Sequence, residues 1–327
     1  MKTIRTPLWD NLRFFLITCV VIGHFVEQVD SNLYKSIFLF IYSFHMPLFI
    51  FVSGLFHKNE RVFQKIVSFI ALYITLKVLI FLIRLAFGAS PVFHLLTENG
   101  LPWFMFALAI FILLTYLLRN TNLKFVLSLS ILFACFAGYI KDIGDFLVLS
   151  RIIVFYPFYL LGVLTDQKKL ESTHENTALR VFSFVFLIFC ALICIFFISR
   201  IYFFRSLFSG RNPFSRFSNN VAQYGALYRL LCYVVSLLTG FSVFMMIPGK
   251  PLGALTIWGS RTLQVFFWHR LFLYVLTGFG IHTALCASLV GKLAWIALAI
   301  ALTILLSQKP FSFPTAQIMA LPYIKRR

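Results

Sequence analysis

The chain is a succession of apolar runs, each about twenty residues long, separated by short stretches that are polar or contain glycine or proline. An α-helix needs about 20 apolar residues to cross the hydrocarbon core of a bilayer, and only helices and closed barrels satisfy their backbone there. Hydrophobic residues make up 61% of the 327 residues and charged residues 12%, too few for the surface of a water-soluble domain. The pattern predicts an all-α, polytopic integral membrane helix bundle. We expect about ten transmembrane helices, at residues 9–29, 34–56, 63–87, 101–119, 123–140, 147–164, 179–199, 226–247, 254–279 and 282–306.

The basic residues predict how this bundle is oriented. An even number of spans places both termini on one side, and cytoplasmic loops carry an excess of Lys and Arg. The loops around 30–34, 88–100 and 280–282 are almost free of basic residues, so both termini should be cytoplasmic. The basic ends and loops contain Lys2, Arg5, Lys58, Arg61, Lys65, Arg119, Lys124, Lys168, Lys169, Arg180, Lys250, Lys309, Lys325, Arg326 and Arg327. The net charge of +19 is thus explained by basic residues in the loops expected on the cytoplasmic side, and we expect no nucleic-acid partner.

One basic segment does not fit this rule. Residues 200–225 contain Arg200, Arg205, Arg211 and Arg216, although the count of spans places them outside. Either a span is miscounted, or this segment covers the outer mouth of the bundle and meets an anionic or sugar-rich acceptor.

No repeat or linker divides the chain, which predicts a single transmembrane domain over residues 1–327. The six cysteines lie inside apolar runs, without CxxC spacing and without histidines in metal-site register. They are expected to be reduced and inert, and we predict no metal site.

The first apolar run contains two ionisable residues that lipid does not tolerate. Arg13 and His24 are eleven positions apart, which is three helical turns plus about 20°, so they share one face with a rise of about 16 Å. Asp10 lies one turn before Arg13, and Glu27 one turn beyond His24. Such a stripe must face protein or a water-filled cavity, and it indicates a functional site.

His24 is the best candidate for a catalytic group, because a buried neutral imidazole can take a proton from a hydroxyl. Asp10 or Glu27 could orient it; the alternative is a histidine that only packs against a neighbouring helix. Arg13 is placed either to hold an anion at the mouth of a cavity or to reach lipid headgroups. Arg61 and Lys65 could complete a phosphate-binding cluster, or they could be ordinary cytoplasmic charge.

Other polar residues of the apolar runs are candidates for lining the site. His45 could serve the chemistry or bond a carbonyl freed by Pro47, and Ser53 belongs to a small surface where a helix or ligand can approach. Trp103 could be an interfacial anchor, and Arg151 needs an anionic partner. His269 is the third intramembrane imidazole, with Arg261 and Arg270 on the same run.

The chain resembles the membrane acyltransferase-3 family, polytopic enzymes that O-acetylate sugars of bacterial surface polysaccharides. Arg13 and His24 after Trp9-Asp10 resemble the first helix of that family. Further elements follow in family order: FHMPLFIFVSG (44–54), LPWFM (101–105), SRIIVFYPFYLLG (150–162) and SRTLQVFFWH (260–269). The absence of a carboxylate at 103–111 is most similar to the fucose 4-O-acetylase-like branch.

This resemblance implies a multi-pass enzyme of the bacterial cytoplasmic membrane that uses acetyl-CoA as a co-substrate, with no permanently bound cofactor. Arg13 and His24 would be the essential pair, with the phosphates of acetyl-CoA held by Arg13, Arg61 and Lys65. Lys65 stands where many members have an arginine, so its phosphate contact would be weaker. His24 would either activate the acceptor hydroxyl or carry the acyl group. The acceptor would be a glycan or lipid-linked sugar, managed by the membrane part or by an envelope-assembly partner protein.

The competing hypothesis is a transporter or flippase that uses the Arg–His stripe as its path. A proton-coupled carrier would more usually show paired carboxylates within its spans, and Glu27 lies near the end of one. The basic cluster at Arg13, Arg61 and Lys65 favours the acyl-CoA enzyme.

Overall fold

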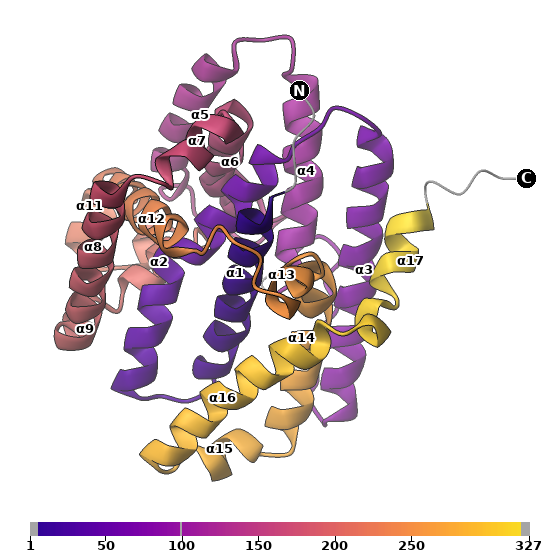
Figure 1. The fold of residues 1–327 in the computed structure, drawn as a ribbon. Helices are drawn as coiled ribbons and strands as arrows, with labels where there is room; N and C mark the ends of the chain where they lie inside the picture. Colours follow the sequence, from indigo (N-terminus) through magenta and orange to yellow (C-terminus); the bar gives the residue numbers. More distant parts are fainter. Residues whose placement is uncertain (1–5, 99, 322–327) are drawn as a thin grey trace, which may run out of the picture.

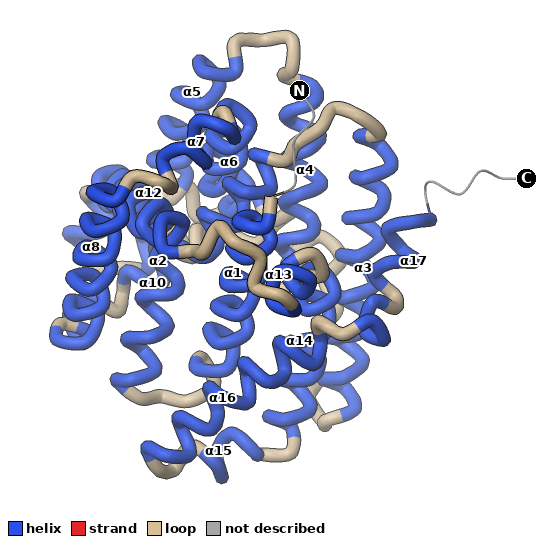
Figure 2. The backbone as a smooth tube through the Cα atoms, viewed as in Figure 1, coloured by secondary structure: helices blue, strands red, loops and turns tan. Residues whose placement is uncertain are grey.

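The computed structural model describes residues 6–98 and 100–321, and all of its regular structure is helical over these ranges. Figure 2 shows the helices joined by loops, with no strand among the described residues. The helices are α1 (Pro7–Val26), α2 (Asn32–Leu55), α3 (Val62–Ala86), α4 (Trp103–Leu117), α5 (Leu123–Ala137), α6 (Leu149–Leu164), α7 (Gln167–Thr173), α8 (Thr177–Phe196), α9 (Ile198–Ile201), α10 (Phe204–Phe208), α11 (Asn219–Gln223), α12 (Gly225–Met246), α13 (Ala254–Gly259), α14 (Thr262–Gly278), α15 (Ile281–Leu285), α16 (Leu289–Leu306) and α17 (Thr315–Ala320), with short 3₁₀ turns at Phe214–Arg216 and Lys309–Ser312.

Six of the described helices are long and apolar enough to cross a membrane, namely α1, α2, α3, α8, α12 and α16. A seventh span is possible if α6 and α7, which meet at a bend of 90°, are counted as one. Each of the ten expected runs contains helix, but α4 and α5 have only 15 residues each. The chain is therefore a multi-pass helical protein, while ten spans and cytoplasmic termini stay predictions.

Helix α1 lies in the middle of the bundle, between α2 and the C-terminal helices (Figure 1). It contacts α2, α13, α14 and α16. The buried Trp295 of α16 donates its indole N–H to the carbonyl of Phe25, at 2.9 Å, and Gly259 of α13 lets the carbonyl of Asp10 approach its backbone. The stripe of α1 is thus enclosed by protein, as its charges require.

Helices α2 and α6 cross closely because each carries a glycine at the contact. A side-chain carbon at Gly54 would collide with the carbonyl of Tyr159, and one at Gly162 would collide with the carbonyl of Phe51. Gly54 therefore provides a small surface within the Ser53-Gly54 pair, and helix α6 occupies it.

Not every expected run is a single helix: 282–306 contains parts of two helices, α15 and α16, and 254–279 is broken as well. Residues 254–279 form two helices, α13 and α14, separated at Ser260 and Arg261. The single helix predicted there is wrong in this respect. The break lets α13 pack against the first half of α1, while α14 brings His269 and Arg270 toward its end.

Candidate functional site

The C-terminal end of α1 carries a cluster of charged side chains around His24. Glu27 caps this helix, and its Oε2 lies 3.6 Å from Nδ1 of His24. Nη1 of Arg270, in α14, lies 3.3 Å from the same nitrogen. The side chain of His24 is 19% exposed and that of Glu27 is 29% exposed, so both are accessible from outside the packed core. The imidazole is held between one anion and one cation.

Glu27 is fixed by two arginines from different parts of the chain. Arg205 of α10 donates to its Oε1 at 2.6 Å, and Nη1 of Arg270 lies 4.0 Å from its Oε2. Burial alone would raise the pKa of this carboxyl, but the hydrogen bond from His24 and the charges of His24, Arg270 and Arg205 outweigh it and lower the pKa to about 2. Glu27 is therefore an anion at every pH at which a cell works.

His269 lies behind His24. Their rings stack with centroids 5.4 Å apart and an angle of 26° between the planes, and His269 is completely buried. Nδ1 of His269 donates to the carbonyl of Val265 at 2.9 Å, so its Nε2 is left as an acceptor. His45 similarly donates from Nδ1 to the carbonyl of Ile41 at 2.8 Å.

Beside His24 is a cavity of about 340 Å³. Four arginines line it, Arg151, Arg205, Arg211 and Arg270, and Glu27 is the one carboxylate among the described residues of its wall. Trp103 forms another part of the wall, with the guanidinium of Arg151 4.9 Å above its ring. Tyr42 also lines the cavity, and its ring lies 4.7 Å from that of His45.

Residues 205–212, part of the basic segment 200–225, line this cavity. Arg205 and Arg211 point into it, and Arg211 forms a two-pronged ion pair with Asp145, at 2.7 and 2.6 Å. Ser150, at the start of α6, donates to the carbonyl of Gly210 at 2.7 Å and ties the segment to the bundle. This part of the segment therefore lies at the cavity beside His24, while a miscounted span and a cover over the outer mouth both stay open and its side of the membrane stays a prediction.

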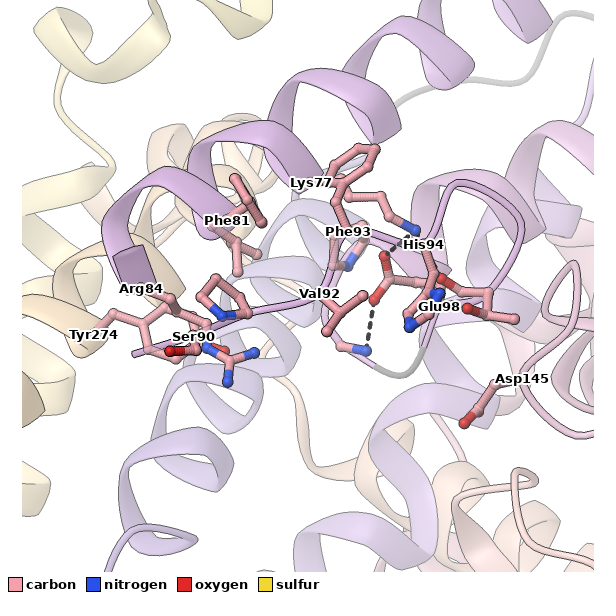
Figure 3. Close-up of a pocket in the computed structure, with 15 residues that line it drawn as sticks. Lys77, Phe81, Arg84, Ser90, Val92, Phe93, His94, Glu98, Asp145 and Tyr274 are labelled. Atoms are coloured by element: carbon pink, nitrogen blue, oxygen red, sulfur yellow. Dashed lines mark hydrogen bonds and ion pairs between the residues drawn. The ribbon is translucent and has the colours of Figure 1, made fainter. Parts of the chain in front are cut away.

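A second cavity of about 350 Å³ adjoins the first, and Gly100 lines both. Figure 3 shows its polar side chains, which include Arg84, His94 and Tyr274. Lys77 and Glu98 form an ion pair at 3.1 Å, and both side chains are about nine-tenths buried. Glu98 also accepts from the backbone N–H of Gly100 at 2.6 Å, so this pair holds the wall between the two cavities.

Arg13 lies at the opposite end of α1 from His24. Its guanidinium is 3.6 Å from Asp10 and lies 4.6 Å above the ring of Phe56, which follows α2. Arg61 precedes α3, and Nζ of Lys65 donates to the carbonyl of Lys58 at 2.8 Å. All three cations thus lie at or near the connection between α2 and α3.

Of the expected lining residues, the structure gathers Glu27, Trp103 and Arg151 in the cavity with His24, and places His269 directly behind it. Asp10 lies with Arg13 at the far end. Ser53 bonds its own helix, donating to the carbonyl of Phe49 at 2.9 Å.

Sequence reasoning did not assign Arg205, Arg211, Arg270 or Tyr42 to the site. Arg270 directly follows His269, and Arg205 and Arg211 belong to the one basic segment that broke the charge rule. That exception was the available signal for the two arginines of the segment.

Comparison with known proteins gives one match. The family model described as an acyltransferase domain, of the acyltransferase-3 family, matches residues 8–308. No curated protein and no solved structure matches the chain.

Proposed function

Since the chain belongs to the acyltransferase-3 family and is a membrane enzyme that transfers acyl groups, we propose that it moves an acetyl group from acetyl-CoA to a sugar hydroxyl. The acceptor in this proposal is a cell-envelope or exported polysaccharide, or its lipid-linked precursor, and the fucose 4-O-acetylase-like branch is the subgroup proposed. The enzyme would work in the cytoplasmic membrane of a bacterium, with an envelope-assembly protein as a possible partner.

The observation that carries the proposal is the contact between His24 and Glu27 at the edge of a polar cavity. A carboxylate 3.6 Å from Nδ1 stabilises the positive charge that an imidazole gains when its other nitrogen takes a proton. That is the arrangement a general base requires. In the proposed step, His24 takes the proton of the sugar hydroxyl while its oxygen attacks the thioester carbonyl. The carbon–sulfur bond breaks, and the coenzyme A thiolate receives the proton.

Acetyl-CoA would enter from the end of α1 that carries Arg13. Its phosphates would be held near Arg13, Arg61 and Lys65. The rise from Arg13 to His24 is about 16 Å, and the pantetheine arm would span this distance along α1. The thioester would then arrive beside His24, opposite the cavity that receives the sugar.

The test uses the purified protein in lipid nanodiscs, with radiolabelled acetyl-CoA and envelope glycan from the producing cell. His24→Ala should abolish label transfer while the protein stays inserted and folded. The control is His282→Ala, because His282 belongs to α15 and lines neither cavity described above. Label transfer by His24→Ala at the wild-type rate would remove His24 from the mechanism.

A second measurement identifies the acceptor class. Mass spectrometry of envelope glycans should show O-acetyl groups that disappear when the gene is deleted. Unchanged acetylation together with altered export of a precursor would instead support a transporter. Mass spectrometry of the enzyme after rapid quenching should find no acetyl group on His24; finding one would replace the direct transfer with an acyl-histidine route.

A further inference from the structure

Resting on the proposed function, we propose that the acceptor is an anionic oligosaccharide bound across both cavities. The cavity beside His24 would receive the sugar that bears the reactive hydroxyl, together with a neighbouring phosphate or carboxylate. The second cavity would receive the next sugar unit.

The charge of the first cavity calls for an anion. Its four arginines come from α6, from the segment 204–212 and from α14. The described carboxylates in contact with them are Glu27 and Asp145, so the cations exceed the carboxylates by two. Crowding like charges in a half-enclosed space is costly unless an anion joins them. The planar guanidinium forms paired hydrogen bonds with phosphate or carboxylate, which makes this cavity a site for such a group.

This anion belongs to the acceptor and not to the donor. In acetyl-CoA the pantetheine arm separates the phosphates from the thioester. If the thioester reaches His24, the phosphates of the same molecule lie an arm's length away, where Arg13 and its neighbours are. The negative group beside His24 must therefore arrive on the other substrate.

The second cavity differs from the first in charge but adjoins it. Of the charged residues that line it, Lys77 pairs with Glu98 and Asp145 pairs with Arg211 of the first cavity, so the second cavity adds one cation, Arg84, against an excess of two in the first. Three features connect the cavities: Gly100 lines both, Asp145 of the second binds Arg211 of the first, and Arg270 of the first lies 5.0 Å above the ring of Tyr274 of the second.

Its lining suits an uncharged sugar ring. Ser90, His94 and Tyr274 offer donors and acceptors for hydroxyl groups, and Phe81 and Phe93 add apolar rings for the C–H face of a sugar (Figure 3). The volume of about 350 Å³ is within the range of small-molecule sites. Together the cavities form a path along which a glycan can extend away from His24.

The experiment measures binding without acetyl-CoA. Oligosaccharides are released from the envelope of the producing cell, deacetylated with mild base, and separated by anion exchange and by size. Binding of each pool to the nanodisc protein is followed by microscale thermophoresis. We expect acidic pools to bind at least tenfold more tightly than neutral pools, and this preference should fall as salt screens it. Phosphatase treatment and carbodiimide–borohydride reduction of carboxylates then identify the source of the charge, since only one of them should abolish binding.

Variants separate the two cavities. Arg270→Gln should weaken binding of acidic pools of every length by about tenfold or more, while Arg270→Lys keeps the charge and should retain part of it. Arg84→Gln should remove the advantage of longer chains and leave the shortest acidic pool unaffected. The matched control is Arg119→Gln. Arg119 follows α4 at the end opposite Trp103, and the described contacts of its side chain are with Tyr116 alone, through the carbonyl and the ring of that residue. Thermal unfolding confirms that each variant is folded.

Equal affinity for neutral and acidic pools, absence of a salt effect, or binding by neither pool would overturn the proposal. So would an equal loss for all lengths in Arg84→Gln. Because no donor is present, these results are independent of whether acetyl transfer occurs, which the labelled acetyl-CoA assay decides separately.

Discussion

Replacing Glu27 by glutamine removes one negative charge from the site with little change in shape. The charge lies 3.6 Å from Nδ1 of His24, whereas the cationic Nη1 of Arg270 lies 3.3 Å from the same atom. At an effective dielectric constant of about 20, unit charges at such distances interact by roughly 4 to 5 kcal/mol. The carboxylate therefore offsets the arginine almost fully, and the imidazole can take up a proton.

Glu27→Gln leaves the repulsion from Arg270 without compensation. If about half of a unit charge has developed on His24 in the transition state, the loss is roughly 2 kcal/mol, or about 30-fold in kcat. The KM for acetyl-CoA should stay near the wild-type value, because the donor phosphates are proposed to bind at the other end of α1. Initial rates of label transfer by the nanodisc protein measure both quantities.

Two further variants make this prediction sharp. Asp30→Asn is the control, since Asp30 is 81% exposed and pairs with Lys35 beyond the same helix end. Its kcat should be unchanged. The double variant Glu27→Gln/Arg270→Gln removes the opposing cation as well and should be less impaired in kcat than Glu27→Gln alone. A kcat of Glu27→Gln within twofold of the wild type, or additive losses in the double variant, would refute the electrostatic reasoning.

Three more predictions follow from the charges. Arg13→Ala should raise the KM for acetyl-CoA about tenfold with kcat nearly unchanged, whereas Arg119→Ala should alter neither; donor titration showing equal KM values would contradict it. Lys77→Met leaves the buried carboxylate of Glu98 without its cation and should cost about 3 to 5 kcal/mol of stability, seen as a lower Tm that Lys77→Met/Glu98→Gln partly restores; an unchanged Tm in the single variant would speak against the pair. The fold lowers the pKa of Glu27 from 4.5 to about 2, so the carboxylate stabilises the protein fully above pH 4.5, and this contribution, at most roughly 3 kcal/mol, is lost as the pH falls toward 2. Thermal unfolding at pH 6, 4 and 3 should therefore show a smaller acid loss in Glu27→Gln than in the wild type, and equal losses would refute it.

The helical fold was predictable because the length of an apolar run is a strong signal in lipid. The break between α13 and α14 was not, because the polar residues there, Ser260, Arg261 and Thr262, are too few to divide a run that is otherwise mostly apolar. Gly259 marks the place, but its effect comes from the carbonyl of Asp10, which lies on a helix far away in the sequence. The number of transmembrane spans was also hard to predict from the sequence. Hydropathy locates apolar segments, but it does not give helix length, and α4, α5 and α6 have only 15, 15 and 16 residues.

The sequence predicted which site residues lie together on one helix, but not which residues of other helices would join them. Helical periodicity placed Glu27 one turn from His24, and the structure brings the two side chains together. Periodicity does not say which other helix faces that stripe, so Arg270 was noted as a neighbour of His269 without a role. Ser53 was expected in the site because small residues allow close approach, but the neighbour that uses this surface is α6.

The reacting group and the charged residues proposed to select the acceptor lie on different kinds of element. His24 stands on a continuous helix of 20 residues, whereas Arg205 and Arg211 belong to a segment whose helices have four or five residues. Short elements tolerate exchange better than the buried centre of a bundle. A new cover over the same α1 could therefore redirect the enzyme to a differently charged glycan while its reacting group stays in place. Transplanting residues 198–216 between relatives would be a practical route to designed polysaccharide acetylation patterns.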